Sequence, residues 1–166
     1  MIRIESATSG DAPLIRQLAE AVWWPTYSPI LAEEQIHYML DKIYDLETIQ
    51  RQIAQNEQTY ILLYDNDKAI GFAAYSPRTE NPDIYKLHKL YCLTETKGMG
   101  YGKRLLQVVE KAVTDNGKTI LELNVNRYNP AKDFYEKKGF IVAYIEDIDI
   151  GGGYWMNDYV MRKMLG

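Results

Sequence analysis

A glycine-rich stretch at residues 97–103 is the part of the chain whose residue types and spacing could most clearly do chemistry. It runs Lys-Gly-Met-Gly-Tyr-Gly-Lys and stands between an alternating apolar run and an amphipathic segment. Glycines let a backbone approach a ligand closely, and the first N–H groups of a helix have no partner inside the helix. A strand, a glycine loop and a helix start therefore predict an anion site, and the ligand we expect is a phosphate or diphosphate.

Two common phosphate motifs do not fit this loop. Its glycines fall as G-x-G-x-G and not as the G-x-G-x-x-G of dinucleotide-binding proteins. The Walker pattern fails as well, because Arg104 stands where Ser or Thr should follow Lys103. For the loop taken by itself, a surface turn that caps a helix without any ligand is the alternative.

The loop resembles the acetyl-CoA pyrophosphate loop of the GCN5-related N-acetyltransferases. That family's pattern, Q/R-x-x-G-x-G/A, maps onto residues 97–102 with Lys97 in the place of Gln or Arg. A second segment, residues 129–140, resembles the family's N-x-x-A-x-x-F-Y-x-x-x-G-F, with Asn129 one residue closer to Ala131 than is usual. Two motifs in the right order are more specific than either one alone.

The resemblance implies that acetyl-CoA is the cosubstrate. In the family a bulge splays two neighbouring strands, and pantetheine pairs with the exposed strand edge as an added strand would. By register this edge falls on residues 90–92, with the N–H of Cys92 nearest the acetyl carbonyl. The cofactor-binding residues that we expect are Leu90, Tyr91, Cys92, Lys97, Gly98, Met99, Gly100, Tyr101, Gly102, Lys103 and Asn129.

Acetyl transfer from a thioester to an amine needs a proton acceptor for the ammonium, a donor for the oxyanion and an acid for the thiolate. Tyr135 occupies the family's tyrosine position, where the phenol lies near the thioester sulfur and can donate to the departing thiolate. A tyrosine packed at the boundary between helix and sheet is the alternative. We treat Tyr135 as the candidate acid.

His88 is the candidate base. It precedes Cys92 by four residues, so both side chains share one face of a strand if no bulge intervenes. An unperturbed pKa of about 6.5 suits proton removal. The alternatives are a half-buried histidine bonded to a backbone carbonyl, and a base elsewhere, such as Glu33 or Glu34. The second histidine, His37, lies far away in the sequence, and we expect no metal.

Aromatic side chains gather in the segments that the resemblance places around the acceptor. Beside acidic residues they could hold a cationic amine by cation–π and ionic contacts, although core packing is the alternative for many of them. These early and late segments resemble the bacterial branch that includes polyamine acetyltransferases. The implied partner is a small-molecule primary amine; a peptide acceptor or a non-catalytic acetyl-CoA sensor are the alternatives. The expected substrate-binding residues are Trp24, Tyr27, Tyr38 and Trp155.

Composition is that of an ordinary globular chain. Hydrophobic residues make up 46% and charged residues 25% of the 166 residues, which predicts one domain over residues 1–166. A net charge of −4 argues against a nucleic-acid partner. Cys92 is the single cysteine, so no intrachain disulfide or cysteine metal cluster is expected. Without a long apolar stretch or a signal sequence, we expect no membrane partner and a cytoplasmic protein; a homodimer is left open.

Apolar periodicity predicts the element order β, three helical pieces, ββ, β, α, β, α, ββ. Residues 23–29, with two prolines, should break the first helix, and residues 65–68 and 151–153 should be hairpin turns. This order is the family's order. It predicts a single-domain mixed α/β fold with a mostly antiparallel sheet, helices on both faces and a splayed central strand pair. The strands we expect are residues 2–7, 59–64, 69–75, 84–93, 119–125, 140–150 and 154–164.

Overall fold

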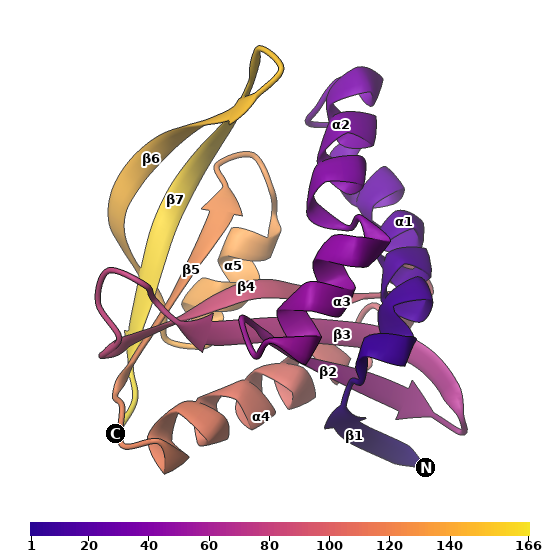
Figure 1. The fold of residues 1–166 in the computed structure, drawn as a ribbon. Helices are drawn as coiled ribbons and strands as arrows, with labels where there is room; N and C mark the ends of the chain where they lie inside the picture. The colour runs from indigo at the N-terminus through magenta and orange to yellow at the C-terminus, as the bar shows by residue number, and fades with distance from the viewer.

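A seven-stranded sheet in the order β1-β2-β3-β4-β5-β7-β6 forms the centre of the computed structural model, which describes residues 1–166 (Figure 1). Every neighbouring pair is antiparallel except β4 and β5, which are parallel. The predicted mixed, mostly antiparallel sheet is confirmed. The strands are β1 Ile2–Ser6, β2 Thr59–Asp65, β3 Lys68–Pro77, β4 Ile84–Cys92, β5 Ile120–Asn126, β6 Ile141–Gly151 and β7 Tyr154–Met164.

Helices cover both faces of this sheet. Figure 1 shows α1, α2 and α3 on one side of it and α4 on the other. Two neighbouring residues of β4 point to opposite faces of the sheet. The ring of Tyr91 lies 6.1 Å from the ring of Trp23 in α1, whereas the Leu90 side chain faces Gly102 of α4. No helix is both long and apolar enough to cross a membrane. The helices are α1 Ala12–Tyr27, α2 Glu33–Ile43, α3 Leu46–Ala54, α4 Tyr101–Asp115 and α5 Ala131–Lys137.

The first helix extends further into residues 23–29 than the sequence predicts. Helix α1 continues through Pro25 and ends at Tyr27. Buried aromatic residues hold this last turn, because the rings of Trp23 and Tyr27 lie 4.4 Å apart in the core. Tertiary packing therefore outweighs the helix-breaking tendency of proline here.

Strands β4 and β5 separate halfway along their length. They pair only between Ile84–Leu87 and 120–123, after which β4 continues beside β3 and β5 continues beside β7. A bulge lies where they part, because Ala74 pairs with Lys89 and Tyr75 with Leu87, leaving His88 as an extra residue. The predicted splayed central pair is confirmed, and it leaves one edge of β4 open.

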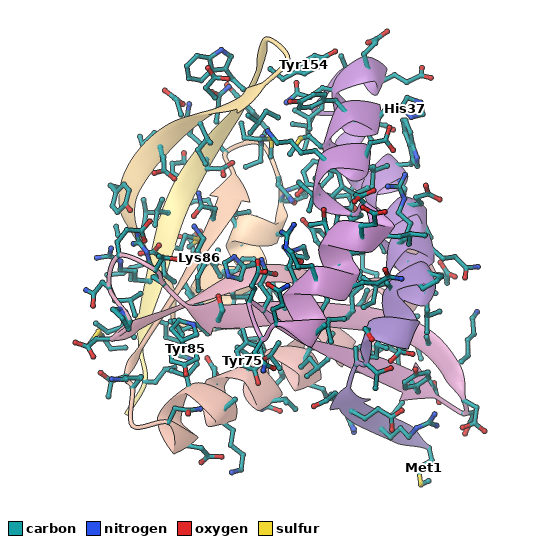
Figure 2. All side chains as sticks on the ribbon, viewed as in Figure 1. Met1, His37, Tyr75, Tyr85, Lys86 and Tyr154 are labelled. Atoms are coloured by element: carbon teal, nitrogen blue, oxygen red, sulfur yellow. The ribbon has the colours of Figure 1, made fainter.

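The tip of the β6–β7 hairpin contacts α2. The hydroxyl of Tyr38 in α2 donates to the carbonyl of Ile150 at 3.0 Å, and the Gln35 amide donates to the carbonyl of Trp155 at 2.8 Å. Tyr154 lies between the tip of the hairpin and α2 (Figure 2), with its ring 5.2 Å from that of Tyr38. These contacts join two elements that are distant in the sequence.

Candidate active site

The loop before α4 presents a row of backbone amides without protein partners. Gly98 and Gly100 hold φ angles of +87° and +81°, which L side chains rarely adopt, and α4 starts directly after Gly100. This set of amides, at the positive end of the helix dipole, is complementary to a phosphate. The residues whose N–H groups donate to no acceptor in the protein are Gly98, Gly100, Tyr101, Gly102 and Lys103.

Three of the predicted loop residues have side chains in solvent. Lys97 and Lys103 are exposed cations beside the free amides, and Met99 is exposed as well. Two ammonium groups next to unpaired N–H groups suit a ligand with more than one negative charge. The loop therefore fits a diphosphate better than a neutral ligand.

Two other loop residues have packing roles. The Tyr101 side chain turns inward, and its hydroxyl donates to an Asp65 carboxylate oxygen at 2.7 Å, so only its amide faces a ligand. Gly102 has no positive φ, and a Cβ placed on it would lie 3.5 Å from the Phe134 ring of α5. Gly102 thus allows α4 and α5 to approach each other. The positive φ angles of the loop occur at the two preceding glycines.

The open edge of β4 offers backbone groups at alternate residues. The N–H of Leu93 donates to the carbonyl oxygen of Ile70 in β3. This bond shows which amides of β4 point toward β3. With a period of two, Tyr91 directs its amide toward β3, whereas Leu90 and Cys92 direct theirs toward the splay. An extended ligand could pair with these two residues as an added strand.

Tyr135 lies at the splay among other phenols. It is buried beside Tyr27 and Cys92, its hydroxyl has no hydrogen-bond partner in the protein, and burial raises its pKa. The Tyr27 and Tyr91 hydroxyls lie 3.1 Å apart and pair with each other. A phenol that stays protonated and unpaired can act as a proton donor. Burial also raises the pKa of the Cys92 thiol to about 12, which leaves it protonated and a poor nucleophile.

Asn129 is used by the protein itself. Its side-chain oxygen accepts the N–H of Ala131 at 2.9 Å, which stabilises the turn that leads into α5 at Ala131. The residue is buried. Its predicted contact with the cofactor would therefore have to come from the other end of the amide.

His88 and Cys92 would share one face only without a bulge between them, and this condition is not met, because the bulge at His88 breaks the alternation. The imidazole is exposed and shares a 2.7 Å hydrogen bond with the Ser76 hydroxyl of β3. Desolvation on the side of the ring that faces the protein, followed by the ammonium groups of Lys89 and Lys86, lowers the pKa of His88 below the ordinary value. A base with a lowered pKa is poorly matched to an ammonium, so His88 is a poor candidate for the base.

The predicted substrate-binding aromatics fall into two groups. Tyr27 and Tyr38 lie on the sheet side of α1 and α2, at the splay and against the hairpin. Trp24 instead packs edge-on against His37, with 4.7 Å between the rings, and Figure 2 places His37 on the side of α2 away from the hairpin. Trp155 is 52% exposed on the hairpin. The structure brings Tyr27 to the splay and Tyr38 to the junction with the hairpin, and it leaves the two tryptophans outside both.

A polar network lies on the α1–α3 face between β4 and β7. Glu122 is 1% exposed and fully paired, since Arg78 and Arg162 approach its oxygens at 3.0 Å and 2.8 Å. Further along β5, Asn124 accepts from Lys86 at 2.7 Å and donates toward Asp158 at 3.2 Å. Lys86, the residue of β4 in this network, is labelled in Figure 2.

Residues 27–162 match the family described as "Acetyltransferase (GNAT) domain". The chain belongs to the GNAT acetyltransferase family. An uncharacterised N-acetyltransferase of Bacillus subtilis (strain 168), YjcF, is 30% identical over 99 residues, or 58% of this chain. That match covers 66% of the relative, so the chain spans just under two thirds of its length.

Solved structures agree with this assignment over the full chain. The PaiA N-acetyltransferase of Thermoplasma acidophilum, in complex with coenzyme A, has a TM-score of 0.84 and 26% identity, with 99% of both chains covered. The ribosomal-protein-S18-alanine N-acetyltransferase of Escherichia coli has a TM-score of 0.70 and 19% identity, covering 100% of this chain and 95% of the other. The second likeness shows the fold alone.

Family membership makes acetyl-CoA the cosubstrate to test against the site. The row of free amides, two positive-φ glycines and exposed lysines fits its diphosphate, and the amides of Leu90 and Cys92 fit an extended chain such as pantetheine.

Asp158 is a buried residue of this region that the sequence analysis missed. It stands between Met156 and Val160 on the inward face of β7, and all three are buried. An acidic residue at an inward position of an otherwise apolar alternation was the available signal.

Proposed function

We propose that the protein transfers the acetyl group of acetyl-CoA to the primary amine of a small cationic molecule. The observation that carries the choice of a small acceptor is the junction between α2 and the β6–β7 hairpin. Tyr38 and Gln35 hold the hairpin by hydrogen bonds to Ile150 and Trp155. An extended peptide would need an open groove on this side, whereas a small amine can lie beneath the junction.

The residues at the splay divide the work of the reaction. When bound, acetyl-CoA supplies an acetyl thioester, which is the electrophile. The Cys92 amide donates a hydrogen bond at the open edge of β4, where the carbonyl oxygen of the acetyl group would gain negative charge. The ammonium proton of the bound acceptor passes to solvent before the attack. Tyr135 gives its proton to the leaving sulfur, and the proton lost by the acylated nitrogen restores the phenol. The first turn of α4 and its glycine loop hold the diphosphate and fix the position of the thioester.

A panel of acceptors tests this function. Free-thiol release from acetyl-CoA is measured with diamines, polyamines, aromatic monoamines and peptides that carry free α-amino or lysine groups. We expect at least one small amine to exceed every peptide in kcat/KM by more than tenfold, and we expect Tyr135→Phe to lose this activity. A preference for peptides would overturn the small-amine proposal. Tight acetyl-CoA binding without turnover on any acceptor would favour a sensor.

A further inference from the structure

Asp158 carries the one fully buried side-chain polar atom of the protein that has no hydrogen-bond partner. This atom is Oδ1, in a residue that is 5% exposed. The other carboxylate oxygen accepts from the Asn124 amide at 3.2 Å. A buried acceptor without a partner is unfavourable, so in a native protein it calls for a physical explanation, such as a catalytic role or a bound ion.

No cation of the protein pairs with this carboxylate. Lys86 donates to the Asn124 oxygen, and Arg127 donates to the backbone carbonyl of Asp158 and to Asp147. Glu146 on β6, half-buried, shares the same Asn124 amide at 3.1 Å and has no ion pair either. Two carboxylates thus lie around one neutral donor. Glu122 on the same face shows the opposite arrangement, with two arginines in contact.

The position of Asp158 connects it to the splay. It lies near enough to Tyr27 to affect the ionisation of that phenol, and Tyr27 pairs with Tyr91 and lies beside Tyr135. The same face is covered by α2 and the hairpin, since Gln35 contacts the sulfur of Met156, two residues before Asp158. An unpaired buried carboxylate therefore lies on the acceptor side of the candidate acid.

We propose that Asp158 binds the ammonium group of the acceptor amine, with Glu146 as a second carboxylate at the more exposed end. An ammonium carries three donors and a positive charge, so it would complete both the hydrogen bonding and the charge of this group. The inference rests on the proposed function, because it concerns the acceptor of that reaction. It adds the residue that selects a cationic acceptor.

The test compares isosteric variants of two aspartates. Asp158→Asn removes the charge and keeps the shape; Asp147→Asn makes the same change on an exposed residue of the adjacent strand. For the best amine of wild type we expect Asp158→Asn to raise KM by about 10- to 100-fold, and Glu146→Gln to raise it less. The Kd for acetyl-CoA should stay unchanged. The Tm should not fall, because an unpaired buried charge has been removed. Asp147→Asn should keep the wild-type KM.

An unchanged KM in Asp158→Asn would overturn the proposal, since Oδ1 would then be satisfied by water. A fall in Tm together with weaker acetyl-CoA binding would also overturn it, because the role would then be structural. If Asp158→Asn does not fold, Glu146→Gln decides by the same KM comparison. If wild type acetylates only peptides, the proposed function fails, but the ratio of KM values on the peptide amine still tests the ammonium site.

Discussion

The two halves of β4 differ in how completely their polar groups are paired. Between Ile84 and Leu87 the strand is bonded on both sides, and the charges next to it are paired around Glu122. From Lys89 to Cys92 the strand has one partner only, and amides on its other edge point into the splay. Polar pairing is complete where the sheet is continuous and incomplete where the strands part.

This difference indicates that one half of the strand serves the stability of the fold and the other half serves ligand binding. Removal of one member of a buried ion pair leaves its partners without a counter-charge, and this destabilises the folded state. An unpaired group near the surface of a splay costs free energy until something binds to it. Substitutions in the paired half should therefore change unfolding, and substitutions around the open half should change binding and turnover.

The largest effect is expected from Tyr135→Phe. The hydroxyl has no protein partner, so its loss should leave the fold intact and remove a proton donor used in the transition state. We expect kcat to fall by about 10²- to 10⁴-fold with little change in KM for acetyl-CoA. Single-turnover kinetics isolate the chemical step. Tyr101→Phe, which removes another phenol hydroxyl, one that pairs with Asp65, is the control and should keep kcat. Equal rates in wild type and Tyr135→Phe would make Tyr135 a packing residue.

Glu122→Gln probes the paired half. The carboxylate is 1% exposed, with Arg78, Arg162 and Lys86 around it, and all three would lose their buried counter-charge. We expect the free energy of unfolding in urea to fall by about 3–5 kcal/mol. Glu80→Gln removes an exposed partner of the same Arg78, at 3.3 Å, and should cost less than about 1 kcal/mol. Similar losses in the two variants would contradict the division between the halves.

Much of the fold could be predicted from the sequence, because turns and periodicity are local signals. Asn66 and Asp67 hold φ angles of 49° and 69° in the β2–β3 hairpin, and that turn lies within the predicted residues 65–68. The glycine loop was found because Gly98 and Gly100 serve a backbone conformation that few other residues adopt. Such positions show in a single sequence.

The bulge and the buried charges could not be predicted in this way. One extra residue at His88 leaves the alternation of Leu87 to Leu90 looking regular, although it changes which face each side chain occupies. Lys89 looks like a surface residue of a strand but is 6% exposed, because Gln58 and two tyrosines from other elements enclose it. Burial of this kind depends on packing between distant segments.

Gly100→Val probes the ligand loop. Valine at φ +81° is strained by roughly 1–2 kcal/mol, and relaxation of the strain would move the free amides of the first turn. We expect the Kd for acetyl-CoA to rise more than about tenfold in calorimetry. Gly117→Val is the matched control, because Gly117 has φ +74° and open space around it beyond the other end of the same helix. It should lose similar stability and no affinity. Equal affinities in both variants would show that the loop does not hold the diphosphate.

The smallest effect is expected for Lys89, whose ammonium donates to Gln58 at 2.9 Å and has no carboxylate partner. Burial lowers its pKa from 10.5 to about 7. Between these values the unfolded chain holds a proton that the folded protein has released, so stability rises with pH in that window. The contribution is complete above pH 10.5 and is lost as pH falls through 7.

The measurement is urea unfolding of wild type and Lys89→Met at pH 7 and pH 8.5. Lys89→Met has no ammonium to release, so the stability of wild type relative to the variant should rise by about 1–2 kcal/mol between the two pH values. The faces of Tyr44 and Tyr60, at 5.8 Å and 5.1 Å from the nitrogen, favour the charged form and set this modest size. Parallel pH profiles would mean that Lys89 stays charged in its aromatic surroundings. The open half of β4 would then hold a buried cation without a counter-charge, and the contrast with Glu122 would be sharper still.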